Sequence, residues 1–333
     1  MDTGNTLLAV RDLHITFASD ESVSRAVVGL NFEVRTGETV CLVGESGCGK
    51  TVSSLAVLGL IPQPPGRIEH GSIRFQGREL LGLPEPALRT LRGKAISMIF
   101  QDPLTSLNPV FTVKEQIQET ILAHESIETK TLEQRLFKLV ASVGLPSPET
   151  TLASYPHQLS GGQRQRVMIA MAMACNPALI IADEPTTALD VTVQDQIIQL
   201  FRSSVQDGTR SILYITHDLG VVANLAQRVY VMYAGLIVEQ GPAGSLFANP
   251  LHPYTRGLLA SLPGTAKRGS LLPSIPGTVP DPSRRPAGCP FHPRCSLRED
   301  TCSRQLPQLE TCGEGHFSRC PILVHSPTGV KGS

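Results

Sequence analysis

The chain has 333 residues, of which 41% are hydrophobic and 17% charged, and its formal net charge is +0. This composition suits one large or two ordinary domains with a buried core, and its balanced charge argues against a nucleic-acid surface or a polybasic membrane anchor. The N-terminus does not resemble a signal peptide, and Asn176-Pro177 interrupts the longest apolar stretch, which is too short to span a bilayer. We therefore expect a cytosolic chain, in which free thiols persist.

Alternating apolar and polar residues predict strands at 7–17, 30–35 and 72–76, and together a small antiparallel layer. Phe17 closes the first of these strands. Its ring is either part of the core or a surface on which an adenine base stacks, and the residues alone favour neither interpretation.

Residues 44–51 read GESGCGKT, the G-x-x-x-x-G-K-[ST] pattern of a phosphate loop. An apolar run at 39–43 predicts a buried strand before it, and residues 52–58 predict a helix after it. Such a turn directs backbone N–H groups inward, and the helix dipole favours an anion. We expect Lys50 to reach the β- and γ-phosphates and the Thr51 hydroxyl to ligate Mg²⁺. A turn without a nucleotide is the alternative, which the flanking strand and helix disfavour.

The whole loop is assigned to nucleotide binding: Gly44, Glu45, Ser46, Gly47, Cys48, Gly49, Lys50 and Thr51.

Gln101 directly follows a strand predicted at 96–100, and two prolines predict a loop at 102–109. A glutamine at this position can ligate Mg²⁺ through its carbonyl oxygen or hold the attacking water, although a glutamine alone is more often a surface residue. From 112 to about 143 the apolar residues recur with a helical period, which Pro146 and Pro148 end.

Ser160, Gly161 and Gly162 stand immediately before a strongly apolar helix, within LSGGQ at 159–163. This predicts a second glycine-rich helix N-terminus and so a second anion site. A serine that only caps the helix is the alternative. It does not explain two adjacent glycines, which are conformationally costly unless a ligand or another backbone segment approaches closely.

An apolar strand predicted at 178–182 ends in Asp183 and Glu184. We expect Asp183 to hold Mg²⁺ through water, and Glu184 to orient and deprotonate the attacking water. TTALD follows as a loop, then a helix at 193–205 and a strand at 212–216. His217, at the end of that strand, lies where a γ-phosphate sensor is expected, although a lone histidine there usually has no such role.

Strands that alternate with helices predict a parallel sheet with its ligand at the carboxyl ends of the strands. The candidate residues share this placement, since each follows a predicted strand: Gly44, Gln101, Asp183, Glu184 and His217.

Six pieces in order resemble the ATP-binding subunits of ABC transporters: GESGCGKT, Gln101, LSGGQ, LIIADEP, ALD and His217. The resemblance implies an ATPase that works as a head-to-tail dimer, with each ATP clamped between the phosphate loop of one subunit and the LSGGQ of the other. It implies that Ser160, Gly161, Gly162 and Gln163 bind nucleotide. It also places Phe17 at the adenine-stacking position.

Three further segments resemble the dipeptide, oligopeptide and nickel importer branch: residues 98–109, 249–263 and 288–295. The resemblance implies two integral-membrane permease subunits, a second identical or related ATPase subunit, and an extracytoplasmic solute-binding protein acting indirectly. It implies a peripheral location on the cytoplasmic face of the inner membrane, with the region near 101–109 and the following helices facing the permease. Alternatives are uptake of nickel or another small solute, a soluble ABC-type ATPase of nucleic-acid maintenance, and a redox-sensing regulator. The nucleic-acid class usually needs a coiled coil or a basic tract, neither of which is present.

Five of the eight cysteines lie near the C-terminus: Cys289, Cys295, Cys302, Cys312 and Cys320. Four thiolates from a compact irregular segment can hold a [4Fe–4S] cluster or Zn²⁺, and the absence of C-x2-C pairs favours the cluster. The subfamily resemblance implies ligation by Cys289, Cys295, Cys302 and Cys320. Cys312 departs from the pattern and leaves the fourth ligand open between it and Cys320. Unligated thiols are the alternative, and a cluster would stabilise a small domain with little core.

These observations predict an α/β fold with a P-loop NTPase-type parallel sheet core, an antiparallel β layer, a helical subdomain and a small irregular cysteine-rich C-terminal domain. The predicted boundaries are an ATP-binding domain at 1–248, with its helical subdomain at about 102–176, and a C-terminal segment at 249–333. Cys48 stands where serine is more usual in the family. It is either a reactive thiol with a lowered pKa or a small neutral residue, and the second interpretation is favoured.

Overall fold

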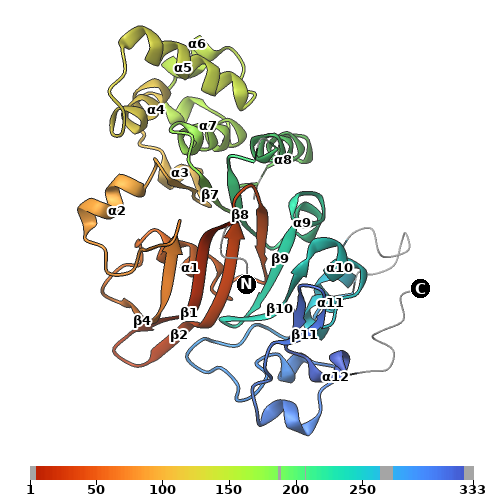
Figure 1. Cartoon of the computed structure of the whole chain (residues 1–333). Coiled ribbons are helices and arrows are strands. Elements are labelled where there is room, and N and C mark those ends of the chain that lie inside the picture. Colours follow the sequence, from red (N-terminus) through yellow and green to blue (C-terminus); the bar gives the residue numbers. More distant parts are fainter. Residues whose placement is uncertain (1–4, 187–188, 207, 263–272, 326–333) are drawn as a thin grey trace. The chain divides into compact units, whose positions relative to one another are not determined.

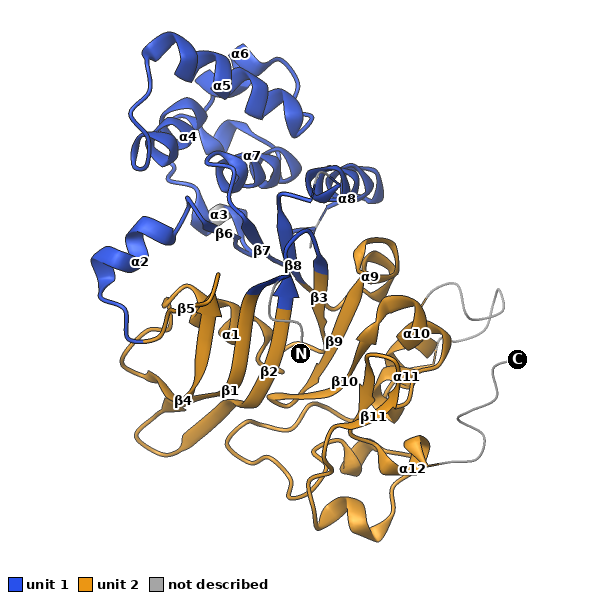
Figure 2. Cartoon of the chain, in the orientation of Figure 1, with its two compact units in different colours: residues 1–7, 34–39, 82–214 blue, residues 8–33, 40–81, 215–333 orange. Residues whose placement is uncertain are grey.

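The computed structural model describes residues 5–186, 189–206, 208–262 and 273–325 (Figure 1). Thr187 and Ala188 of the predicted TTALD loop lie outside these ranges, as do residues 263–272 of the proline-rich segment. The chain divides into two compact units (Figure 2). Unit 1 comprises residues 1–7, 34–39 and 82–214, and unit 2 comprises residues 8–33, 40–81 and 215–333.

Unit 2 contains all but a few end residues of the predicted antiparallel layer, a sheet in the order β2-β1-β4-β5. Its strands are β1 (Thr6–Ala18), β2 (Val23–Arg35), β4 (Gly66–Phe75) and β5 (Arg78–Glu79). Strand β1 runs antiparallel to β4, with Phe17 opposite Gly66. Both β2 and β4 begin earlier than the alternation of residue types predicts, because polar residues and glycines in the first half of each strand interrupt the pattern.

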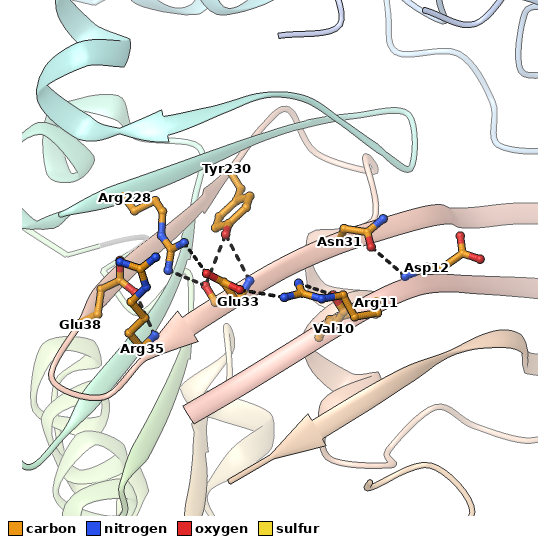
Figure 3. Close-up of polar contacts among 9 residues, drawn as sticks. All are labelled: Val10, Arg11, Asp12, Asn31, Glu33, Arg35, Glu38, Arg228 and Tyr230. Atoms are coloured by element: carbon orange, nitrogen blue, oxygen red, sulfur yellow. Dashed lines mark hydrogen bonds and ion pairs between the residues drawn. The ribbon is translucent and has the colours of Figure 1, made fainter. Parts of the chain in front are cut away.

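Glu33 on β2 connects the antiparallel layer to β9 (Arg228–Tyr233), as Figure 3 shows. Its carboxylate pairs with Arg11 at 2.8 Å and with Arg228 at 3.1 Å, and its backbone N–H donates to Tyr230 Oη at 3.2 Å. Burial raises the pKa of Glu33, but hydrogen bonds and charges from the two arginines outweigh it, so the pKa lies below 4.5. The carboxylate therefore remains ionised at neutral pH and holds both cations.

The second group of strands in unit 2 has the order β11-β12-β10-β9-β3. Strand β3 (Thr39–Val43) is parallel to β9, and β10 (Leu236–Pro242) is antiparallel to it. The hairpin of β11 (Glu310–Gly313) and β12 (His316–Ser318) adds to the free side of β10. The helical segments of unit 2 are α1 (Lys50–Val57), α9 (Leu219–Leu225), α10 (Ala243–Ala248), α11 (Pro253–Ala260), η3 (His292–Arg294), η4 (Asp300–Ser303) and α12 (Pro321–Val324).

Unit 1 contains β6 (Ile96–Ile99) and β7 (Leu179–Asp183), which are parallel, with Ile96 opposite Leu179. Strand β8 (Ser211–Thr216) lies on the other side of β7, and the boundary between the units falls within it. All five residues of β7 are buried. The helical segments are α2 (Glu85–Leu91), α3 (Pro103–Ser106), α4 (Val113–Leu122), α5 (Thr129–Ser142), α6 (Pro148–Ala153), η2 (Pro156–Gln158), α7 (Gly161–Met173) and α8 (Val191–Val205).

Three other predicted regions also differ from the structure. The region at 102–109 is not entirely a loop, because Pro103 begins the short helix α3, and proline is tolerated in the first turn of a helix. The helical region at 112–143 consists of two helices, α4 and α5. The sequence does not predict the break between them, because helical periodicity alone does not locate it. Helix α1 begins at Lys50 rather than at residue 52, so Lys50 and Thr51 are themselves helical. In the described ranges, no helix combines the length and apolar character needed to cross a membrane.

Candidate functional site

The phosphate loop joins the buried strand β3 to α1, and two of its glycines are required by close backbone contacts. A Cβ atom at Gly44 would lie 2.2 Å from the carbonyl oxygen of Met232, and one at Gly49 would lie 2.6 Å from that of Ala26. Gly49 also has a φ of 105°, which L-residues with side chains rarely adopt. Only glycine therefore allows the backbone of the loop to pass this close to its neighbours.

Lys50 is the first residue of α1, and its side chain lies inside the loop. The residue is only 5% exposed. Its ammonium group donates to the carbonyl oxygen of Gly44 at 2.7 Å and to that of Glu45 at 3.0 Å. Gly49, the N-cap of α1, provides no side-chain hydrogen bond, so no side chain caps the first turn from that position. This arrangement of a buried cation and an uncapped helix N-terminus suits an anion.

Other residues of the loop differ in accessibility. Ser46, Gly47 and Thr51 are exposed, so their polar groups can meet a ligand from solvent. Cys48 is buried, and burial raises the pKa of its thiol above the usual value, although Lys50 opposes the shift. This favours a small neutral residue over a reactive thiolate.

Phe17 lies half-buried near the end of β1. A Cβ atom at Gly66, its partner on β4, would lie 2.9 Å from the Phe17 ring. The glycine thus makes room for an aromatic side chain that keeps part of its surface accessible.

In unit 1, the polar residues at the ends of β6 and β7 come together as predicted. Asp183 is the last residue of β7 and is 1% exposed. Glu184 follows with a φ of 46°, which is uncommon for a residue with a side chain. The amide of Gln101 donates to the Glu184 carboxylate at 3.0 Å. Uncommon backbone conformations of this kind concentrate at functional sites.

Helix α7 begins at Gly161, directly after Ser160, as LSGGQ predicts. Ser160 and Gln163 form a capping box: the serine hydroxyl accepts from the Gln163 N–H at 3.3 Å, and the glutamine side chain accepts from the Ser160 N–H at 2.8 Å. A Cβ atom at Gly161 would meet nothing within 4 Å. A pocket of about 310 Å³ adjoins this helix start, lined in part by Ser160, Gly162 and Arg166. Within the chain the serine therefore acts as a cap, and the space over Gly161 is open.

His217 directly follows β8 and is exposed. The next residue, Asp218, caps α9 by accepting hydrogen bonds from the N–H groups of Gly220 at 2.8 Å and Val221 at 3.4 Å. The exposed histidine therefore directly precedes a capped helix start.

Four of the C-terminal cysteines line one cavity: Cys289, Cys295, Cys302 and Cys320. Burial raises the pKa of Cys289 and of Cys320 to about 11, and backbone N–H groups partly oppose the shift. Cys312 is not among the lining residues; it lies on β11 and packs against the cluster formed by Leu251, Cys320 and Leu323. In the part of the chain that the structure describes, no three His, Cys, Asp or Glu side chains are grouped so that they could hold a metal ion.

Two residues that contact the phosphate loop were not predicted from the sequence. Tyr254 and Arg294 both bind Glu45, the tyrosine through the backbone N–H and the arginine through the carboxylate. Both lie in segments that resemble the peptide and nickel importer branch, NPLHPYTRGLLASLP and GCPFHPRC. Their position in those segments was the one sign in the sequence that they could have a role. The neighbouring residues in the sequence do not indicate which distant residue each of them contacts.

Comparison with known proteins gives two family matches. Residues 27–187 match the ABC transporter family, and residues 238–302 match the family described as the oligopeptide/dipeptide transporter, C-terminal region.

Several curated relatives are similar over almost their whole length. A probable peptide ABC transporter ATP-binding protein of Sinorhizobium fredii is 48% identical, covering 94% of this chain and 94% of the relative. The oligopeptide transport ATP-binding protein AppD of Bacillus subtilis is 47% identical, with 95% and 96% covered. The dipeptide transport ATP-binding protein DppD of Escherichia coli is 48% identical, with 94% and 96% covered.

Among solved structures, a dimeric ATP-binding cassette in a post-hydrolysis state with ADP and Pi is similar, with a TM-score of 0.65 and 26% identity. The alignment covers 71% of this chain and 98% of that one. The similarity identifies the fold as that of a P-loop ABC ATPase with mixed α/β sheets.

Proposed function

The chain belongs to the family of ATP-binding subunits of oligopeptide and dipeptide ABC transporters, and from this premise we propose that it powers the uptake of dipeptides or oligopeptides through a membrane permease. It is an ABC-type ATPase, so the energy source is ATP hydrolysis. Phosphate loops occur in many NTPases. The observation that carries the proposal of peptide transport is therefore the second family match, at 238–302.

The phosphate loop is the proposed ATP site. Lys50 would move from the loop carbonyls to the β- and γ-phosphates, and the N–H groups of the loop and of the uncapped α1 would hold the phosphate oxygens. Phe17, with its ring partly accessible, would stack on adenine. All residues from Gly44 to Thr51 belong to this site.

Mg²⁺ supplies positive charge that neutralises the phosphates when it is bound. The donor types fit such an ion: Thr51 offers a hydroxyl oxygen, Asp183 a carboxylate and Gln101 an amide oxygen.

Glu184 is the proposed general base. Its carboxylate would accept a proton from the attacking water while the water oxygen bonds to the γ-phosphorus and ADP leaves. The hydrogen bond from Gln101 at 3.0 Å supports this role because it orients the carboxylate. His217 would contact the γ-phosphate from the end of β8.

A second ATPase subunit, identical or related, would complete each ATP site with its own Ser160, Gly161, Gly162 and Gln163. The open space over Gly161 supports this arrangement, since an incoming phosphate would meet no side chain there. The further proposed partners are two integral-membrane permease subunits and, indirectly, an extracytoplasmic solute-binding protein. The chain would then lie peripherally at the cytoplasmic face of the inner membrane. The proposed domains are 1–248, with a helical subdomain at about 102–176, and 249–333.

The C-terminal segment is proposed to hold a [4Fe–4S] cluster through Cys289, Cys295, Cys302 and Cys320, with Zn²⁺ as the alternative. Support comes from the single cavity that these four thiols line and from the position of Cys312 outside that lining. When bound, the group would cross-link a segment that has little regular secondary structure.

An uptake assay tests the proposed function. Disruption of the gene in its source organism should abolish accumulation of a labelled dipeptide, and the wild-type gene should restore it. The matched control is Lys50→Ala, which should not restore it. Normal dipeptide uptake in the disrupted strain, or a loss of nickel uptake alone, would refute peptide transport. DNA-stimulated ATP hydrolysis without a permease would favour the nucleic-acid alternative.

Anaerobic purification tests the metal proposal. The protein should be brown, with broad absorbance near ~400 nm from a thiolate-bound cluster, and Cys320→Ser should lose the colour while Cys312→Ser keeps it. Colourless protein that contains stoichiometric zinc would refute the cluster and favour Zn²⁺ as the bound metal.

A further inference from the structure

Glu45, the second residue of the phosphate loop, is held by two residues from outside the loop. Its backbone N–H donates to Tyr254 Oη at 2.8 Å. Its carboxylate accepts two hydrogen bonds from the Arg294 guanidinium, at 2.7 and 3.0 Å. Tyr254 lies on α11, and Arg294 is the last residue of η3. The loop is therefore tied to the cysteine-rich C-terminal segment by a bidentate ion pair, the strongest geometry for an arginine and a carboxylate.

Arg294 is enclosed and fully engaged. Its side chain is 6% exposed, against 30% for Glu45. Its Nε donates to the Pro276 carbonyl at 2.7 Å, and the remaining contacts are Tyr233 Oη at 3.3 Å and the Ile275 carbonyl at 3.4 Å. The guanidinium also lies 5.7 Å from the centre of the Tyr233 ring. An arginine has five N–H donors, and all five have partners here, so the group is held in one geometry.

Arg294 lies on a short helical segment that cysteines flank on both sides. Cys295 follows it directly in the chain. At the other end of η3, the Cys289 carbonyl accepts from the His292 N–H at 3.0 Å, and the Cys289 N–H donates to the Cys302 carbonyl at 2.8 Å. These three cysteines all line the cavity described above. The backbone that carries Arg294 is thus part of the cavity wall.

The charge of Glu45 matters because the ligand of this loop is an anion. The Lys50 ammonium lies 3.0 Å from the Glu45 carbonyl oxygen, so the carboxylate belongs to a residue that lines the loop. An unpaired carboxylate there would repel a triphosphate, whereas pairing with a buried arginine neutralises it.

We propose that Arg294 is a positioning residue of the nucleotide site: it fixes and neutralises Glu45, so that ATP affinity depends on the folded cysteine segment. The inference rests on the proposed role of the phosphate loop as the ATP site. It makes the C-terminal segment part of the nucleotide site, because a rearrangement of the cavity wall moves the guanidinium away from the loop.

The test measures the ATP affinity of the full-length chain with a fluorescent ATP analogue, together with KM and kcat. Arg294→Ala should weaken ATP affinity by at least about tenfold, because the Glu45 carboxylate loses its buried partner, and should raise KM more than it lowers kcat. Adding Glu45→Gln should recover a large part of the lost affinity, because the loop then carries no unpaired carboxylate. Arg304→Ala, which removes an exposed arginine from the same segment, is the matched control and should leave the affinity unchanged.

Two results would overturn the inference. One is an Arg294→Ala variant that binds ATP within about twofold of wild type. The other is a double variant that binds no better than Arg294→Ala, which is the result expected if the arginine only stabilises the fold. If Arg294→Ala does not fold, Arg294→Gln undergoes the same comparison with the same expectation. A wild-type chain that fails to bind ATP would instead refute the proposed function itself.

Discussion

Two helices of this chain begin after glycine-rich turns, and their N-termini are built in different ways. Helix α1 begins after Gly49, which provides no side-chain cap, and a buried lysine lies within the loop before it. Helix α7 begins after Ser160, whose hydroxyl and N–H both bond to Gln163, and its first residue faces open space. The first combines an uncapped helix start with an enclosed cation, the features expected of an anion site, whereas the second is already capped and is accessible from outside.

This difference suits different roles in nucleotide binding for the two glycine-rich turns. A site with an uncapped helix start and an enclosed cation can hold phosphate without help. A capped and exposed helix start can only add to a ligand that is held elsewhere. The two turns look alike in the sequence, yet only the first should bind nucleotide in the isolated subunit.

The largest expected effect is that of Glu184→Gln, which should bring the two helix starts together on one nucleotide. The variant should bind ATP but hydrolyse it about 10²- to 10⁴-fold more slowly, because it lacks a general base. The closed dimer should then accumulate, as measured by size-exclusion chromatography with ATP and Mg²⁺. Hydrolysis at the wild-type rate would remove Glu184 from its proposed role.

Lys50→Ala should act on α1 alone. Loss of the buried ammonium should weaken ATP binding to the isolated chain by about 100-fold, the value of charged hydrogen bonds to phosphate. Isothermal titration with ATP measures the change. Unaltered binding would mean that the uncapped helix start is sufficient and would weaken the contrast drawn above.

Matched glycine substitutions separate the two turns. Gly49→Ala should destabilise the fold by about 2 kcal/mol or more, because a positive φ and a contact of 2.6 Å with a backbone oxygen oppose a Cβ atom. Gly161→Ala should leave the stability unchanged or raise it by up to about 1 kcal/mol, since the Cβ atom meets no neighbour. Denaturant unfolding of both variants measures this difference. If Gly161→Ala nevertheless lowers ATP turnover in the assembled complex, the glycine is needed for a contact between subunits.

Only a small loss of stability is expected for Ser160→Ala on the isolated chain. Removal of the capping hydroxyl should cost about 1 kcal/mol of stability without changing the affinity for ATP. Thermal unfolding with and without ATP measures both quantities. A loss of ATP affinity in the isolated chain would show that α7 contributes to the site within one subunit.

The parts of the structure that follow from local sequence were predictable. Strand β3 has the predicted bounds because Thr39 and the four apolar residues after it stand directly before the glycine-rich phosphate loop. The meeting of Gln101 with Glu184 was also predictable in outline, because both residues follow parallel strands and parallel strands end at one edge of a sheet.

Other features depend on contacts between distant residues or on backbone geometry. Glu45 and Arg294 are 249 positions apart, and neither has a neighbour that indicates the other. The positive φ of Glu184 is set by the turn after β7 and not by its own preference, so nothing in the residue type reveals it. Similarly, the capping box of Thr112 and Glu115 fixes where α4 begins, but nothing equally clear marks where it ends.

The hairpin of β11 and β12 has a consequence for solubility. Without it, β10, a strand of seven residues, would be the outermost strand of its sheet in unit 2 and would offer unpaired N–H and C=O groups along the side away from β9. The hairpin pairs Glu239 with Ser318 and Gln240 with Phe317, and the new outer strand, β11, has only four residues. Proteolytic removal of the chain beyond about residue 305 would therefore expose β10 as an unpaired edge strand. Copies of the truncated chain would be prone to aggregate by pairing these edge strands.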